Sequence, residues 1–106
     1  MSEFVAVAQV ADLADPGKLC VEVDGQFVVV VKVDGEYYCI DDVCTHDGGP
    51  LGEGPLVGHC LACPRHGAQF DVRTGQPVTM PATVPTAVHD VQIADGAILV
   101  RLGRPH

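Results

Sequence analysis

Short apolar runs separated by glycine, proline and aspartate extend along the chain, and none shows the 3.6-residue repeat of a long amphipathic helix. Strands are expected at residues 4–7, 19–23, 26–33, 36–41, 56–61, 68–72, 86–93 and 97–102. Residues 10–17 contain aspartate, proline and glycine, which predicts a turn or a single helical turn. The pattern therefore predicts an all-β protein.

A continuous apolar run over residues 27–31 stands out within the strand expected at 26–33. A strand without alternating polar residues is typical of one that is covered on both faces. Asp-Gly pairs at 24–25 and 34–35 flank this strand, and another such pair lies at 95–96. Because Asp-Gly supplies the positive φ angles of a two-residue hairpin, we expect an antiparallel meander followed later by a last hairpin.

Residues 43–80 interrupt this regular pattern with many glycines and prolines. Within them we expect the two short strands at 56–61 and 68–72, and a turn at Thr74-Gly75. The chain has 106 residues, which is close to the common size of one domain. We therefore expect a single domain over 1–106, with a subdomain inserted at about 43–80.

The chain is acidic, with 6 basic and 14 acidic residues and a formal net charge of −8. This charge argues against nucleic acid or anionic membrane as a partner, because both require a basic face. It favours a partner with a basic docking patch, although acidity could also serve solubility alone. With no long apolar run and no basic N-terminal region, the sequence predicts a soluble cytoplasmic protein.

Five cysteines are present, and this odd number together with the absence of an export signal argues against a disulfide framework. Two of them lie close to histidines, in Cys44-Thr45-His46 and, after sixteen residues, in the motif Cys63-Pro64-Arg65-His66. Thiolate and imidazole together suit iron–sulfur clusters and zinc. A zinc site could instead use the C-x-x-C pair, Cys60 and Cys63, together with Cys44 and His66.

The paired motifs and their flanks, at 44–51 and 63–71, resemble the Rieske iron–sulfur signature. They are similar to the stand-alone bacterial ferredoxins that serve ring-hydroxylating oxygenases. The resemblance implies the Rieske fold, an antiparallel β-sandwich or meander with an inserted cluster-binding subdomain. It also implies one [2Fe–2S] cluster per chain, with Cys44 and Cys63 on one iron and His46 and His66 on the other. Residues 80–85 would form a proline-bearing loop over the cluster.

The function implied by this resemblance is one-electron transfer rather than catalysis. The chain would carry electrons from a flavin-containing, NADH-linked reductase to the terminal oxygenase of a dioxygenase system, as a monomer. Two alternatives remain from the sequence: a Rieske subunit of a nitrite reductase or monooxygenase, and a zinc-stabilised binding module.

The other cysteines and histidines are expected to have structural or surface roles. We expect Cys20, Cys39 and Cys60 to be buried strand residues, and His89 and His106 to lie on the surface; His59 falls outside the motif.

The flanks of the motif also bear on the reduction potential. Gly49 and Arg65 stand where high-potential members of the family carry a disulfide, and Ala68 and Phe70 stand where they carry hydroxyls. The resemblance therefore implies a potential low in the Rieske range.

Overall fold

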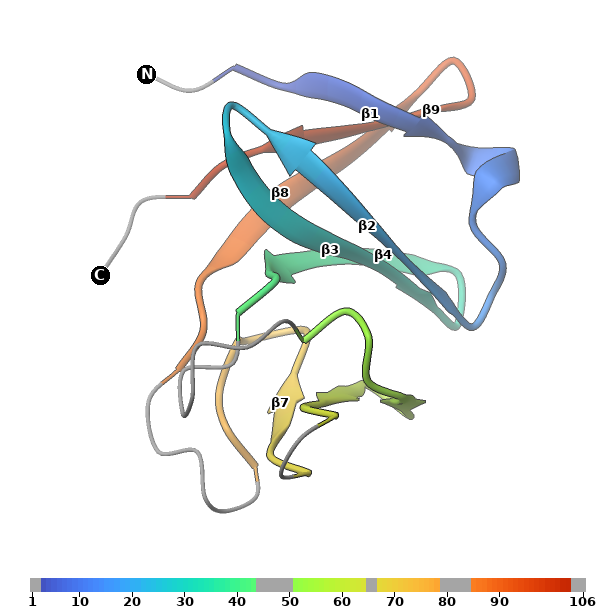
Figure 1. Ribbon diagram of the computed structural model, residues 1–106. Helices are drawn as coiled ribbons and strands as arrows, with labels where there is room; N and C mark the ends of the chain where they lie inside the picture. The colour runs from blue at the N-terminus through green and yellow to red at the C-terminus, as the bar shows by residue number, and fades with distance from the viewer. Residues whose placement is uncertain (1–2, 44–50, 65–66, 79–84, 104–106) are drawn as a thin grey trace.

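A computed structural model describes residues 3–43, 51–64, 67–78 and 85–103 of the chain. Six strands form the larger sheet, in the order β1-β9-β8-β4-β3-β2, and every neighbouring pair is antiparallel. Their bounds are β1 (Val5–Gln9), β2 (Gly17–Val23), β3 (Gln26–Val33), β4 (Glu36–Asp41), β8 (Val88–Ala94) and β9 (Ala97–Arg101). The two end strands, β1 and β2, contact each other, so the sheet curls on itself (Figure 1). The predicted all-β architecture is confirmed.

Asp-Gly turns set the register of this sheet. In all three turns the aspartate and the glycine both have positive φ, from 50° at Asp24 to 81° at Gly35. These angles are those of type I′ hairpins, whose twist matches that of the flanking strands. The bounds predicted for β3 and β4 are confirmed, and the predicted helical turn is a single 3₁₀ turn, η1 (Val10–Asp12). No helix among the described residues is long and apolar enough to cross a bilayer.

Strand β3 lies between two apolar cores, which explains its continuous apolar sequence. Val28 and Val30 pack inside the curled sheet, against a core that includes Ile98. Val29 and Val31 point to the opposite face, into a second core. All four valines are fully buried, so the expected two-sided burial is confirmed for 28–31. Phe27 differs from the expectation: it is 61% exposed, because it lies at the end of the strand beyond both cores.

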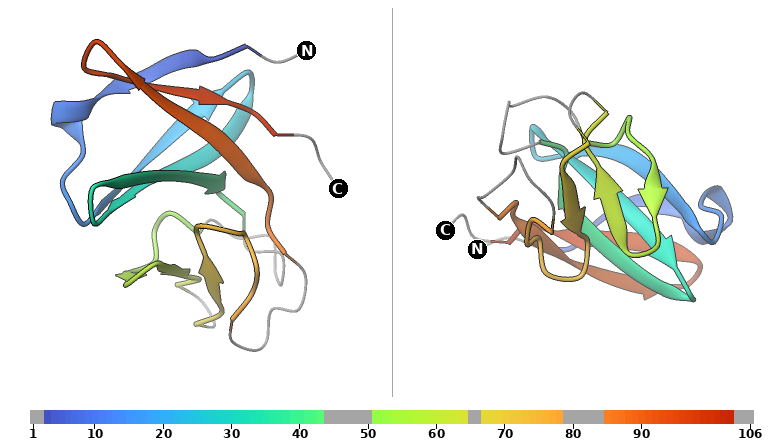
Figure 2. Two further views of the ribbon diagram at one scale, coloured as in Figure 1. Left: turned by 180° about the vertical axis from the view of Figure 1, so that it is seen from behind. Right: turned by 90° about the horizontal axis from the view of Figure 1, so that it is seen from below.

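The insert, as we call the described residues between β4 and β8, packs on the second face of β3 and β4 (Figure 2). It contains a three-stranded antiparallel sheet in the order β5-β6-β7. The strands are short: β5 (Leu56–Val57), β6 (Cys60–Ala62) and β7 (Gln69–Asp71). The prediction of one strand over 56–61 is wrong, because Gly58 at φ +59° turns the chain there and makes a hairpin.

Candidate metal centre

The predicted ligand Cys63 directly follows β6 and is buried in the second core, with 1% of its surface exposed. Its backbone N–H donates to the Ala68 carbonyl (2.7 Å), and its carbonyl accepts from the Gly67 N–H (2.9 Å). Gly67 has φ +75°, which allows this tight return of the chain. Residues 63–68 are therefore closed into a loop between β6 and β7, and we call it the second ligand loop. His66 belongs to this segment of the sequence but lies outside the described residues.

A first ligand loop, residues 43–51, is closed by a contact between the residues that flank it. The Gly52 N–H donates to Asp42 Oδ1 at 2.6 Å, a partly buried contact that links two residues ten positions apart. The Gly54 N–H then donates to the carbonyl of Leu51, which is fully buried. Cys44 and His46 lie between these anchors in the sequence and outside the described residues. The described residues on either side of them, Asp42 and Gly52, are therefore in direct contact.

Strand β2 also contacts this anchor. Lys18 Nζ donates a hydrogen bond to the Gly52 carbonyl. The Cys20 sulfur lies where a side chain on residue 52 would be, so a Cβ added to Gly52 would overlap it. Partial burial of its sulfur raises the pKa of the Cys20 thiol, and the neighbouring Asp42 carboxylate raises this pKa further through its charge and a hydrogen bond. Gly52 is thus contacted by side chains of β2 and by the carboxylate that follows β4.

The bases of the two ligand loops meet at Gly54. A Cβ on Gly54 would overlap the Ala62 carbonyl and come within 3.1 Å of Pro64 Cδ, so only glycine fits. The Ala62 N–H donates to the Pro55 carbonyl at 3.0 Å. The segment that leaves the first loop therefore packs directly against the start of the second loop. This close approach is the arrangement that a metal centre with ligands from both loops requires.

The zinc alternative is not favoured by the position of Cys60. Leu61 packs in the second core with Cys63, whereas Cys60 precedes it on the strand and so points to the opposite face. Cys60 pairs in register with Asp71, and burial followed by the charge of Asp71 raises the pKa of its thiol.

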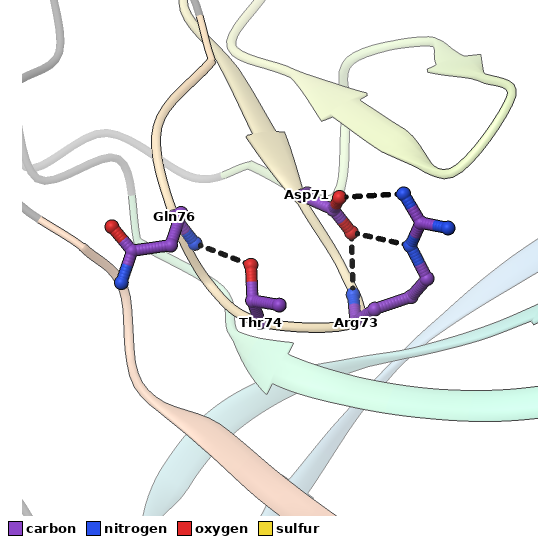
Figure 3. Close-up of polar contacts among 4 residues, drawn as sticks. All are labelled: Asp71, Arg73, Thr74 and Gln76. Carbon is purple, nitrogen blue, oxygen red and sulfur yellow. Dashed lines mark hydrogen bonds and ion pairs between the residues drawn. The ribbon is translucent and has the colours of Figure 1, made fainter.

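The turn that follows β7 is fixed by Asp71 and Arg73 (Figure 3). The Asp71 carboxylate accepts from the backbone N–H of Arg73 at 2.9 Å and from two guanidinium nitrogens at 3.0 and 2.8 Å. The hydrogen bonds from Arg73 hold the pKa of Asp71 below its usual value. The Asp71 carbonyl also accepts from the Gly75 N–H at 2.7 Å, which confirms the predicted turn at Thr74-Gly75.

The remaining cysteines differ in their burial. Cys20, Cys39 and Cys60 all lie in strands, as predicted, but only Cys39 is fully buried. The expectation of burial is wrong for Cys20, which is exposed on the outer face of β2, and Cys60 is half-buried. Burial raises the pKa of Cys39 to about 12, so its thiol is inert.

The histidines outside the motif also differ in their burial. His89 was expected at the surface and is buried, with its side chain only 1% exposed. Its Nε2 lies 2.7 Å from Asp41 Oδ1, and its Nδ1 accepts from the Gly103 N–H at 2.8 Å. His59 is half-buried and forms an edge-on contact with the ring of Tyr38. His106 lies outside the described residues.

The residues present fit a [2Fe–2S] cluster of the Rieske type. The sequence of the two loops contains two cysteines and two histidines, which could supply two thiolates and two imidazoles. With these ligands two ferric ions and two sulfides would carry no net charge, which suits the apolar core in which Cys63 packs with Leu51, Ala68 and Phe70. Lys18, Asp42 and Gly52 could not be found from the sequence, since Lys18 and Gly52 lie 34 positions apart in it and belong to no motif.

Comparison with known proteins supports this assignment. The family model described as the Rieske [2Fe-2S] domain matches residues 3–93. The ferredoxin CarAc of Metapseudomonas resinovorans is 40% identical over 73 residues, which cover 69% of this chain and 68% of that protein. A solved structure of the ferredoxin of carbazole 1,9a-dioxygenase from Nocardioides aromaticivorans IC177 matches with a TM-score of 0.90 and 32% identity, over 94% of this chain and 98% of that one.

A second solved structure extends the comparison to a complex. It is a complex of reduced oxygenase and oxidized ferredoxin in carbazole 1,9a-dioxygenase, and one of its chains matches with a TM-score of 0.88 and 33% identity over 92% of both chains. The fold, the two closed ligand loops and these similarities lead to one assignment. The chain belongs to the Rieske [2Fe–2S] family, and within it to the ferredoxins that carry electrons in dioxygenase systems.

Proposed function

We propose that Cys44, His46, Cys63 and His66 hold the cluster, and that the chain carries single electrons from an NADH-linked flavin reductase to a terminal ring-hydroxylating oxygenase. The observation that supports this most strongly is the contact between the bases of the two ligand loops, where Gly54 packs on Ala62 and Pro64. We also propose that residues 1–106 form one domain, with residues 43–80 as the cluster-binding part, and that the protein is a cytoplasmic monomer.

The described residues contribute burial and rigidity to this function. When bound, the cluster accepts and releases one electron at a potential between roughly −150 and +300 mV across the Rieske type. Cys63 lies in an apolar core that excludes water, and its backbone is hydrogen-bonded on both sides. A ligand that is held in this way moves little when the charge of the site changes, which favours fast electron transfer. The chain thus acts as a carrier rather than as a catalyst.

The acidic surface supports docking onto a basic patch of the reductase or the oxygenase. With a formal charge of −8, the chain should associate faster at low ionic strength. Attraction between exposed charges is screened over about 10 Å at 0.1 M salt. We therefore expect the rate of electron transfer to fall as salt is added, measured by stopped-flow absorption with purified reductase. A rate that does not depend on salt would assign the acidity to solubility.

Ligand substitutions test the proposed set of four. Cys44→Ser and Cys63→Ser should abolish the Rieske absorption and electron paramagnetic resonance (EPR) spectra, because each removes a thiolate. Cys39→Ser and Cys60→Ser are matched controls and should retain both spectra. If Cys60→Ser loses the metal while His46→Ala retains it, the four-ligand proposal is wrong and the zinc alternative is right.

A further inference from the structure

The first ligand loop is the longer of the two loops, and its ligands lie close to one of its anchors. Cys44 and His46 follow Asp42 by two and four residues, and the chain returns to Asp42 at Gly52. A carboxylate that accepts a backbone N–H forms one of the stronger hydrogen bonds in proteins. Here the same side chain defines the start of the loop and holds its end. Any movement of Gly52 relative to Asp42 would change the path of the residues between them.

Gly52 is held through both of its backbone polar groups. Its N–H donates to Asp42 Oδ1 at 2.6 Å, and its carbonyl accepts from Lys18 Nζ. The residue is buried, so loss of either hydrogen bond would leave a polar group without water and would cost free energy. The Cys20 sulfur, together with Val29 Cγ2, occupies the side on which a Cβ of residue 52 would project. The three side chains belong to two different parts of the sheet: β2 for Lys18 and Cys20, and the end of β4 for Asp42.

We propose that Lys18, Cys20 and Asp42 form a clamp on Gly52 that positions the first ligand loop and thereby retains the cluster. The clamp rests on the proposed ligand set, because it acts on the loop that carries Cys44 and His46. It connects the cluster site to the edge strand of the large sheet. The three clamp residues are positioning residues: they need not touch the cluster, and they act through the backbone of residue 52.

The rate of iron release to a chelator measures this role in the intact holoprotein. Asp42→Ala removes the acceptor for the Gly52 N–H, and Lys18→Met removes the donor to its carbonyl. We expect each to release iron about tenfold faster, which corresponds to about 1.4 kcal/mol. Asp42→Asn should have a smaller effect than Asp42→Ala, since its amide oxygen still accepts the N–H. The EPR lines of the reduced Asp42→Ala variant should also broaden, because Cys44 and His46 would adopt more than one position.

A pair of variants tests the contact with Cys20 directly. Gly52→Ala should speed iron release, because the added Cβ overlaps the Cys20 sulfur. The double variant Cys20→Ala, Gly52→Ala removes that sulfur and should recover most of the lost retention. A general loss of stability would not be rescued in this way. If the double variant releases iron as fast as Gly52→Ala, the Cys20 part of the clamp is wrong.

Asp15 provides the matched control. Its carboxylate accepts the backbone N–H groups of Asp34 (3.0 Å) and Gly35 (2.7 Å) at the turn that precedes β4, whereas Asp42 follows the other end of that strand. Asp15→Ala should lower the melting temperature of the protein and leave iron release unchanged. The clamp is refuted if Asp42→Ala and Lys18→Met release iron at the unmodified rate, or if Asp15→Ala accelerates release equally. If the unmodified protein contains no iron, the proposed ligand set is refuted. The clamp would then still be tested by hydrogen exchange, which should be slow at the Gly52 amide.

Discussion

In the large sheet, β2, β3 and β4 pair over seven and six consecutive residues, whereas the strands of the insert pair over only two and three. The large sheet has a core of its own inside its curl, centred on residues such as Val28, Val30 and Ile98. The insert shares its core with the outer face of β3 and β4. The large sheet is therefore stabilised by long ladders and by a core that it does not share with the insert. The insert has only short ladders and closed loops, and in the proposed centre a metal would join those loops.

Removal of iron should produce the largest difference between the two regions, in their rates of amide exchange. Structural metal binding contributes directly to folding free energy, and here the metal would link the two ligand loops. We expect amide exchange in β5, β6 and β7 to accelerate by about 100-fold, or about 2.7 kcal/mol, with little change in β2–β4. Hydrogen–deuterium exchange with mass spectrometry on holoprotein and chelated protein measures this. An equal change in both regions would mean that the molecule opens as a single unit.

Substitution in each core gives the next largest effect and tests whether the two cores are independent. Phe70 and Ile98 are both fully buried, one in each core. Replacement by alanine costs about 3–5 kcal/mol for a buried phenylalanine and about 2–5 kcal/mol for a buried isoleucine. We expect Phe70→Ala to lower the melting temperature and to release iron, and Ile98→Ala to lower the melting temperature only. Iron loss from both variants at the same temperature would contradict this independence.

A hydroxyl introduced beside Cys63 should give a smaller effect, on the reduction potential. Ala68 and Phe70 pack in one core with Cys63 and carry no hydroxyl. A donor directed at sulfur stabilises the more negative reduced state, so Ala68→Ser and Phe70→Tyr should each raise the midpoint potential. A rise of about 59 mV would correspond to a tenfold change in the one-electron equilibrium.

Val30→Thr is the control for this prediction, because it adds a hydroxyl to the other core. Its potential, measured by redox titration followed by absorption, should equal that of the unmodified protein. Two folded hydroxyl variants with intact clusters and unchanged potentials would refute this explanation of the predicted low potential.

The two regions also differ in how much the sequence reveals. The bounds of β3 and β4 follow from the sequence because a continuous apolar run ends at Asp-Gly turns on both sides. These signals are local and depend on a few neighbouring residues. In the insert, one apolar run from 56 to 61 conceals a hairpin at Gly58. Strands this short leave too few residues for alternation to be recognised.

Contacts between distant residues account for what the sequence could not predict. His89 is buried because Asp41, 48 positions away, and Gly103, 14 positions away, satisfy its two ring nitrogens. Cys20 is exposed because it lies on the outer face of β2, whereas its neighbours Leu19 and Val21 face the core inside the curled sheet. The ligand motif, in contrast, could be identified because both halves are short and have fixed spacing. The assignment of Cys44, His46, Cys63 and His66 stays a prediction.

Pulsed EPR of the reduced protein, combined with iron and sulfide analysis, tests the central claim most directly. We expect two irons and two acid-labile sulfides per chain, with nitrogen couplings from two imidazoles. His46→Ala and His66→Ala should each remove the coupling of one imidazole or the cluster itself. A spectrum without histidine nitrogen couplings, or a protein that contains zinc in place of iron, would contradict the proposed centre.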